Sequence, residues 1–272
     1  MAELLIHSMS EFSDIILAVL EQAKAQRIAE IGAEYGGMSS LLADHARDQG
    51  GHLFSIDPAP KPEFLRWAAK QAHVTHIAKP SLAALPDLAD IDAWLIDGDH
   101  NWYTVYHELK AIDAACTRDA KPMLAILHDV GWPSGRRDMY YAPESIPEAF
   151  RHDYCMDSGA MPGRSDLYPG RGFRGMGSFG WAKHEGGPRN GVQCAVEDFV
   201  SEASQDETRQ LAYAEIPAVF GLGLLFDMDA PWAPAVAELA LPYHNNRLLA
   251  SLEQNRLANY LRVLDWQDGH VR

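Results

Sequence analysis

The chain has 272 residues, of which 47% are hydrophobic and 22% charged, as is typical of a soluble globular protein with a substantial core. Its 38 acidic residues outnumber its 23 lysines and arginines and give a net charge of −15, which disfavours nucleic acid and anionic membranes as partners. The three cysteines, Cys116, Cys155 and Cys194, lie far apart, which argues against a disulfide framework or a zinc site. No signal peptide and no run of about 18 apolar residues is evident, so we expect a cytoplasmic protein.

Hydrophobic periodicity predicts helices that alternate with short strands along the first half of the chain. The predicted helices span 12–24, 38–48, 61–72, 82–88 and 104–116, and the predicted strands span 27–32, 52–57, 74–79, 91–97 and 122–129. Strands and helices that alternate at this spacing form right-handed βαβ units around a mostly parallel sheet. In such sheets ligands bind outside the carboxyl ends of the strands, so polar residues at strand ends are expected to share one rim.

The alternating pattern stops after residue 129. Residues 131–190 are rich in Gly, Pro, Arg and Tyr, and a segment this long without periodicity predicts a functional cover, or lid, over an active site. Periodicity returns with a predicted helix over 191–203, with Asn190 as its N-cap, and two strands that form an antiparallel pair at the far edge of the sheet. We expect a single domain over 1–272, with its core in 25–130 and 191–230 and a C-terminal helix over 245–266.

The stretch "AEIGAEYGG" combines a strand end with a turn rich in glycine. Glu30, Gly32 and Gly36 follow one another at a spacing that differs from the G-x-G-x-x-G of dinucleotide-binding turns. Taken alone, it also fits a simple strand–helix turn. Asp57 ends the next strand, and a carboxylate there can accept hydrogen bonds from the two hydroxyls of a ribose. Together the turn and Asp57 favour a nucleoside ligand without a pyrophosphate.

An ordered set of motifs extends this pattern. Glu30-x-Gly32-x-x-x-Gly36, Asp57, "LIDGDHNWYTVYHEL" and "ILHDVGW" together resemble class I S-adenosylmethionine-dependent methyltransferases. Within them the chain is similar to the bacterial Methyltransf_24 branch, near the cephalosporin-hydroxylase-like and macrolide-sugar O-methyltransferases. The resemblance covers residues 27–130 and implies a Rossmann-like, doubly wound, seven-stranded α/β sheet. This sheet would be mostly parallel with an antiparallel edge strand, and the lid would be inserted into it.

The resemblance also implies where S-adenosylmethionine would bind. Glu30, Gly32 and Gly36 would line its methionine and ribose end, Asp57 would hold the ribose hydroxyls, and Ser81 would lie near adenine. The segment around Ser81 lacks the acid that the family often carries there. The remaining residues expected to contact the cofactor are Tyr35, Ser39, Asp97, Asp99 and His100.

A cluster of polar residues is expected where the fourth and fifth strands end. Asp97 and Asp99 end one strand, and His128 and Asp129 end its neighbour, about 4.8 Å away. By the resemblance, Asp97 and Asp129, with His128 beside them, would bind Mg²⁺ or another divalent metal that orients substrate hydroxyls. In the alternative, the cluster binds no metal and His128 or His100 acts as the general base, oriented by Asp97 or Asp129. A purely structural cluster is the third interpretation.

The lid supplies candidates for substrate binding. Arginine forks bind carboxylate or phosphate groups, although lid arginines also pair with acids of their own loop. The candidates are Arg136, Arg137, Tyr140, His184 and Arg189. We expect O-methylation of a small-molecule hydroxyl, such as a diol, catechol or sugar in natural-product modification. Alternatives are N-methylation, a hydroxylase-like reaction and a non-catalytic protein that binds the cofactor; a homodimer or higher homo-oligomer is also expected.

Overall fold

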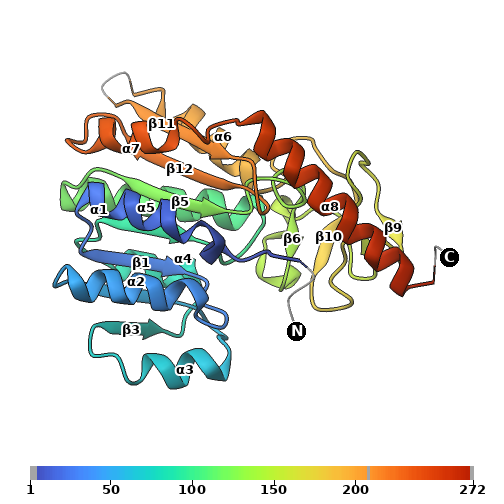
Figure 1. The fold of residues 1–272 in the computed structure, drawn as a ribbon, viewed down its shortest axis with the longest axis horizontal. Coiled ribbons are helices and arrows are strands. Elements are labelled where there is room, and N and C mark those ends of the chain that lie inside the picture. The colour runs from blue at the N-terminus through green and yellow to red at the C-terminus, as the bar shows by residue number, and fades with distance from the viewer. Residues whose placement is uncertain (1–4, 207–208, 270–272) are drawn as a thin grey trace.

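The computed structural model describes residues 5–206 and 209–269. Seven strands form the main sheet in the order β11-β12-β5-β4-β1-β2-β3 (Figure 1). They are β1 (Arg27–Ile31), β2 (His52–Ile56), β3 (Val74–Ile77), β4 (Ala93–Ile96), β5 (Leu124–His128), β11 (Leu211–Ile216) and β12 (Leu222–Asp227). Helices connect the parallel strands, as the alternating pattern predicts. The predicted Rossmann-like α/β fold is confirmed.

The strand directions bring the functional ends together. Strands β1 to β5 pair in parallel, with Ile31 beside Ile96 and Ile96 beside Leu127. Strand β12 is antiparallel to both of its neighbours, β5 and β11, so the antiparallel pairing expected at the edge is present. All the residues of β4 and β5 are buried, which explains their continuous apolar sequences. The carboxyl ends of β1, β4 and β5 therefore meet at the centre of one rim.

Helices cover both faces of the sheet (Figure 1). On one face α1 (Ser13–Ala23) contacts α2 (Gly37–Asp48) and α7 (Ala233–Ala240), preceded by the short helix η1 (Met9–Phe12). On the other face α5 (Trp102–Asp119) contacts α4 (Ser81–Ala84), η2 (Leu85–Asp87) and α6 (Val192–Ala203). Helix α3 (Pro62–Ala68) packs near β3. Two apolar clusters, one on each face, form the core.

Residues 131–190 are ordered by small sheets rather than by helices. One sheet joins β6 (Met139–Tyr140), β10 (Gly180–Ala182) and β7 (Tyr154–Cys155), and a second pairs β8 (Ser158–Gly159) with β9 (Tyr168–Pro169). Single turns η3 (Pro143–Ser145) and η4 (Glu148–Phe150) lie between them. This region extends from the sheet beyond the carboxyl ends of the strands (Figure 1).

Helix α6 does not begin as predicted. Its N-cap is Gly191, and the side chain of Asn190 instead accepts from the backbone N–H of Asp138 at 2.8 Å and donates to two lid carbonyls. The N–H of Gly191 donates to Asp138 Oδ1 at 2.6 Å. The lid residue Asp138 therefore accepts the hydrogen bond from the N-cap of α6.

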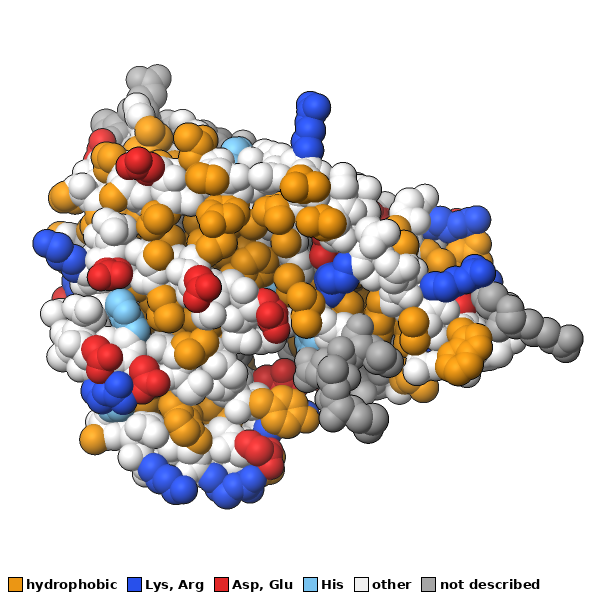
Figure 2. Space-filling view, in the orientation of Figure 1, with side chains coloured by type: hydrophobic (Ala, Val, Ile, Leu, Met, Phe, Trp, Pro, Cys, Tyr) orange, Lys and Arg blue, Asp and Glu red, His pale blue; other side chains and the backbone are white. Residues whose placement is uncertain are grey.

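Helix α8 (Arg247–Gln267) runs along the outside of the molecule, from β12 toward β9 (Figure 1). Hydrophobic side chains gather on the surface between α1 and the first turns of α8 (Figure 2). Among the described residues, no helix combines the length and the apolar character needed to cross a membrane.

Candidate active site

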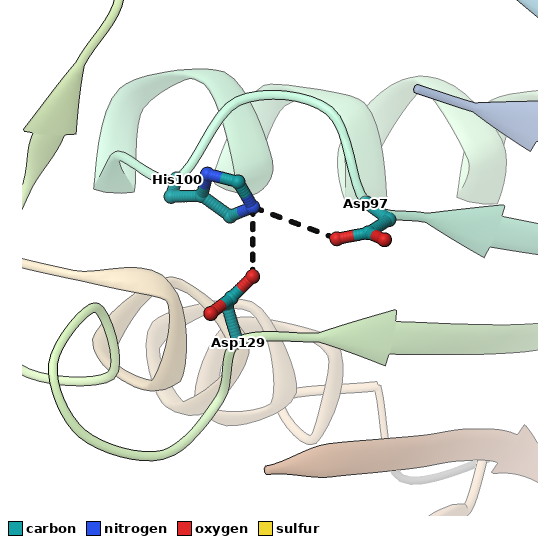
Figure 3. Close-up of side chains that lie close together, drawn as sticks. All are labelled: Asp97, His100 and Asp129. Carbon is teal, nitrogen blue, oxygen red and sulfur yellow. Dashed lines mark ion pairs between the residues drawn. The ribbon is translucent and has the colours of Figure 1, made fainter. Parts of the chain in front are cut away.

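Three side chains converge at the carboxyl ends of β4 and β5. Asp97 follows β4, Asp129 follows β5, and His100 lies in the loop that leads from β4 into α5. His100 Nε2 is 2.9 Å from Asp129 Oδ2 and 3.6 Å from Asp97 Oδ1, and the three side chains point toward one another (Figure 3). Their candidate ligand atoms all lie within 4.8 Å of one another. The rim of the parallel sheet thus brings two carboxylates and an imidazole to one point.

His128, the last residue of β5, lies beside this cluster. Its Nε2–H donates to the carbonyl oxygen of Val219 at 2.9 Å, and its Nδ1 lies 3.1 Å from Asp97 Oδ1 and 3.2 Å from Asp129 Oδ2. Burial opposes a charge on this ring, but the two carboxylates outweigh it and raise the pKa of His128 well above its usual value. A protonated His128 therefore holds both carboxylates from inside the sheet.

His100 has a similar electrostatic environment. Burial alone would lower its pKa, but Asp129 and Asp97 raise the pKa of His100 to about 10. For Asp129, burial works in the opposite direction, and the two histidines lower its pKa well below the usual range. The two carboxylates therefore favour the charged form of both rings. The two histidine rings lie next to the carboxylates of the cluster, at positions where a metal cation could also bind.

The glycine turn lies directly against this cluster. Gly32 has φ +90°, and a Cβ on it would lie 2.2 Å from the carbonyl oxygen of Asp97. Gly36, with φ +86°, is the N-cap of α2. Only glycine combines this backbone conformation with so close an approach, so the turn and the loop after β4 pack with their backbones in contact.

Glu30 lies beneath the turn and is buried. Its Oε2 accepts hydrogen bonds from Ser39 at 2.6 Å and Ser55 at 2.7 Å. Burial raises the pKa of Glu30 to about 7, although both hydroxyls oppose this shift. Ser39, predicted to contact the cofactor, is fully buried and bonded to Glu30. Tyr35 is exposed on the turn, with the Lys61 ammonium 5.5 Å from its ring centre.

Asp57 binds the glycine turn in this structure. Its Oδ2 accepts from the backbone N–H groups of Ala33 and Glu34, each at 3.0 Å, and its Oδ1 accepts from Ala59 N–H at 2.8 Å. A carboxylate has about four acceptor positions, so these bonds leave capacity for a ribose hydroxyl. The ribose role of Asp57 stays a prediction, and so does the adenine role of Ser81, which begins α4 half-buried.

Asp99 and Glu108 are acidic groups on the same side of the site. Asp99 Oδ2 accepts from the Thr104 hydroxyl at 3.1 Å, and burial raises the pKa of Asp99. Glu108, on the buried side of α5, was not among the predicted site residues; burial raises its pKa to about 8. A glutamate at a core-facing position of an amphipathic helix was the signal that could have identified it.

The five predicted substrate residues of the lid are engaged elsewhere. Arg136 forms a two-point ion pair with Glu197, with N–O distances of 2.6 and 2.5 Å, and Arg189 lies 5.3 Å from the ring centre of Trp102. His184 Nδ1 is 2.7 Å from Asp166 Oδ1 on the exposed surface. The two arginines thus differ from the alternative in which they pair with acids of their own loop, because Glu197 lies in α6 and Trp102 in α5.

Two of these predictions need correction because the side chains are buried. Arg137 is fully buried and donates to the backbone carbonyls of Ala182, Arg164 and Ser165. Tyr140 is 1% exposed, and its hydroxyl donates to Asp138. Neither side chain is accessible to a substrate in this structure.

The next residue, Tyr141, is the lid side chain at the cluster. It is half exposed, and its ring centre lies 5.9 Å from that of His100. The backbone N–H of Met139 donates to the carbonyl oxygen of His100 at 2.9 Å, so strand β6 is bonded to the site loop. Asp138 Oδ1 also accepts a hydrogen bond from the backbone N–H of Trp102 at 2.7 Å. These contacts hold the lid against the start of α5.

The chain is similar to several solved structures. It is 14% identical to the SAH-bound methyltransferase PaMTH1 of Podospora anserina, with a TM-score of 0.47 and coverage of 78% of this chain and 76% of that one. It is 16% identical to the O-methyltransferase TomG of Streptomyces achromogenes, solved with SAM, with a TM-score of 0.46 and coverage of 82% of both chains. Because both TM-scores are below 0.5, these similarities do not inform on the substrate.

The family match is more specific. No curated protein matches the chain. Residues 29–130 match the Methyltransf_24 family, described as a methyltransferase domain. This segment contains the glycine turn, Asp57 and all three members of the cluster at the strand ends. The match identifies a methyltransferase domain in this part of the chain.

Proposed function

We propose that the protein transfers the methyl group of S-adenosylmethionine to a hydroxyl oxygen of a small molecule. The observation that carries this proposal is the convergence of Asp97, His100 and Asp129 beside the turn at Gly32. A cofactor on that turn would present its sulfonium methyl toward the cluster, since both lie at one rim of the sheet. An acceptor hydroxyl at the cluster would then be in line with the methyl group.

The donor set fits a divalent cation. Two carboxylates and one imidazole suit Mg²⁺, Mn²⁺ or Fe²⁺, and the ligands would be Asp97, Asp129 and His100 rather than the predicted His128. The ion would have to displace the proton of His100 Nε2, because a ligating imidazole nitrogen carries no proton. Bound there, such an ion would lower the pKa of an acceptor hydroxyl and orient it. His128 Nδ1, which faces both carboxylates, would keep them oriented toward the site.

The protein's own groups account for the remaining steps. The acceptor oxygen forms its bond to the methyl carbon as the carbon–sulfur bond breaks, which leaves S-adenosylhomocysteine. The hydroxyl proton passes to a carboxylate of the cluster; Asp97, whose side chain is 25% exposed, is the more accessible one. Tyr141 and the rest of the lid would exclude water from the acceptor.

A mechanism with a histidine base is less favoured by the geometry. His100 is held between Asp97 and Asp129, which raise its pKa to about 10 despite burial, so its ring already carries a proton at neutral pH. A general base must be unprotonated before the reaction. The non-catalytic alternative is one outcome of the experiment below.

Calorimetry with the cofactor and the metal separately tests the proposal. We expect S-adenosylmethionine to bind the wild type, and Mn²⁺ to bind the wild type but not Asp97→Asn or Asp129→Asn. The matched control is Asp44→Asn, which removes an exposed acid on α2 and should leave both affinities unchanged. Absence of cofactor heat would refute the methyltransferase proposal. Cofactor binding with no metal binding would leave a metal-independent transferase or a non-catalytic cofactor-binding protein.

We further propose a small-molecule acceptor and a cytoplasmic location. The net charge of −15 disfavours nucleic acid and anionic lipid surfaces as partners. Cys116, Cys155 and Cys194 are free thiols, which supports a reducing compartment.

A further inference from the structure

The exposed face of α8 has side chains at alternating spacings of four and three residues. We call them the α8 stripe: Leu248, Leu252, Asn255, Asn259, Arg262 and Trp266. Leu248 and Trp266 are each 67% exposed and Leu252 is 57% exposed, whereas the opposite face of the helix buries Leu257 and Leu261. Side chains that alternate in this way form one continuous face of the helix, the kind of face along which two α-helices pack.

We propose that the α8 stripe is the interface of a homodimer in which two copies of α8 pack antiparallel. The stripe has the same spacings in both directions, so a two-fold axis level with Leu257 aligns it with itself. Leu248 then faces the partner's Trp266, and Leu252 faces the partner's Arg262. A stripe that is its own complement favours a second copy of the chain over an unrelated partner.

The paired side chains are chemically compatible. The Leu248 side chain would pack on the indole ring of the partner's Trp266, and Leu252 would pack on the aliphatic part of the arginine side chain. At the centre, Asn255 faces the partner's Asn259; within one copy, Asn259 Nδ2 already donates to Asn255 Oδ1 at 3.0 Å. Amide groups at the centre of a helix pair favour one register over its alternatives.

Charge favours this surface for self-association. The chain has a net charge of −15, yet the exposed positions from 247 to 267 include two arginines and no acid. The two acids of the helix, Glu253 and Asp265, are paired with Arg256 and Arg171. Two strongly negative molecules therefore meet little repulsion along α8.

The antiparallel direction adds a favourable contact at each end. Arg247, exposed in the first turn, would lie beside the carboxyl end of the partner's α8. That end bears the negative end of the helix dipole. The C-cap carboxylate, Asp268, is already paired with Arg174 at 2.7 Å, so the dipole is the main attraction. A parallel pair would instead bring the two Arg247 side chains together.

The surface is long enough for a stable contact. A helix of 21 residues is about 30 Å long, and exposed Leu241 and Tyr243, just before it, extend the apolar area. Figure 2 shows further hydrophobic side chains between α1 and the start of α8. Such a surface is large enough to bury about 800 Å² per partner, the area of a standard protein interface.

Sedimentation velocity at micromolar concentrations tests the interface. We expect the wild type to have the mass of two chains. Leu252→Glu should raise the dissociation constant about tenfold or more, because it sets a carboxylate at the interface of two negative molecules. Leu65→Glu, which changes an exposed leucine on α3, is the matched control and should remain dimeric. A wild type with the mass of one chain, or a dimer unaffected by Leu252→Glu, would overturn the proposal.

Disulfide cross-linking tests the register. Leu252→Cys and Arg262→Cys in one chain lie about 15 Å apart along the helix, too far for an intrachain bond. In the proposed dimer, position 252 of one copy would face position 262 of the partner. We expect the double variant to form a covalent dimer on oxidation, and each single variant to stay uncrosslinked. Equal cross-linking by Leu252→Cys alone would overturn the antiparallel arrangement.

Discussion

The ring centres of Tyr141 and His100 lie 5.9 Å apart, which brings one aromatic side chain of the lid to the Asp97–Asp129 cluster. A second lid ring, Phe179, lies 6.1 Å from Tyr141 in an edge-on arrangement. Tyr141 is half exposed, so it can contact an acceptor without first moving away from the core. The acceptor, in our proposal, lies between this ring and the cofactor.

Tyr141→Ala should therefore weaken acceptor binding and leave cofactor binding unchanged. Loss of one aromatic contact is worth about 0.5–1.5 kcal/mol, or about two- to tenfold in KM for the acceptor. Steady-state kinetics would measure KM, and calorimetry would measure the cofactor affinity. Tyr154→Ala, at another partly exposed lid tyrosine, is the control. Equal effects of the two variants would contradict a role for Tyr141 at the acceptor.

Gly32→Ala should disrupt the glycine turn. The added Cβ would lie 2.2 Å from the carbonyl oxygen of Asp97, in a backbone region with φ +90° that L side chains rarely adopt. We expect a loss of about 3 kcal/mol or more in the free energy of unfolding and a loss of cofactor affinity. Urea denaturation and calorimetry would measure the two effects.

Gly163→Ala separates the two causes. Gly163 also has a positive φ, +74°, but a Cβ there meets nothing within 4 Å. Gly163→Ala should lower the free energy of unfolding by about 1 kcal/mol, the cost of the backbone strain alone. If Gly32→Ala were no more destabilising than Gly163→Ala, close packing of the turn against Asp97 would not be the reason for glycine.

The sequence predicted the sheet and the position of the cluster because both depend on periodicity. Strands that end in Asp97 and Asp129 must place these residues at one rim once the strands are parallel neighbours. His100 was predicted as a base or cofactor contact, and its place between the two acids depends on the path of the loop after β4. That path is fixed by backbone contacts, such as Gly32 against Asp97, which leave no periodic signal.

The lid could not be predicted to the same degree. Of the two neighbouring tyrosines, Tyr140 ends strand β6 and is buried, whereas Tyr141 follows the strand and is half exposed. Strand β6 has two residues, too few for a pattern that would show which one is buried. The burial of Arg137 depends on lid carbonyls up to 45 positions away in the sequence, contacts that a local pattern cannot indicate.

Glu30→Gln should change how stability depends on pH. Burial raises the pKa of Glu30 from 4.5 to about 7, so between these values the folded state binds more protons than the unfolded state. The contribution of protonated Glu30 to the free energy of unfolding is therefore fully present below pH 4.5. It is lost as the pH rises through 7, by up to about 3 kcal/mol. Glutamine has no proton to lose and can still accept from Ser39 and Ser55.

Urea denaturation from pH 5 to 8 would measure this dependence. We expect Glu30→Gln to become more stable relative to the wild type as the pH rises. Glu238→Gln, at an exposed position of α7, should show no such trend. A difference between Glu30→Gln and the wild type that stays constant over this range would show that Glu30 does not titrate with a raised pKa.

Asp138 is the residue whose loss should most weaken the attachment of the lid. Its Oδ1 accepts from the N–H groups of Trp102 and Gly191, at the starts of α5 and α6, and its Oδ2 accepts from the Tyr140 hydroxyl at 2.7 Å. Asp138→Ala would leave buried donors unsatisfied and should cost about 3–5 kcal/mol. Tyr140→Phe removes one of these bonds and should cost about 1 kcal/mol.

The double variant tests whether these bonds act together. The bond between Tyr140 and Asp138 is lost in either single variant, so the double variant should cost about 1 kcal/mol less than the sum of the two. Urea denaturation of all three variants, compared with the wild type, would measure this coupling. Additive costs would show that the tyrosine hydroxyl contributes nothing through Asp138. Because Met139 bonds to the carbonyl of His100, Asp138→Ala should also displace Tyr141 and raise KM for the acceptor more than Tyr140→Phe does.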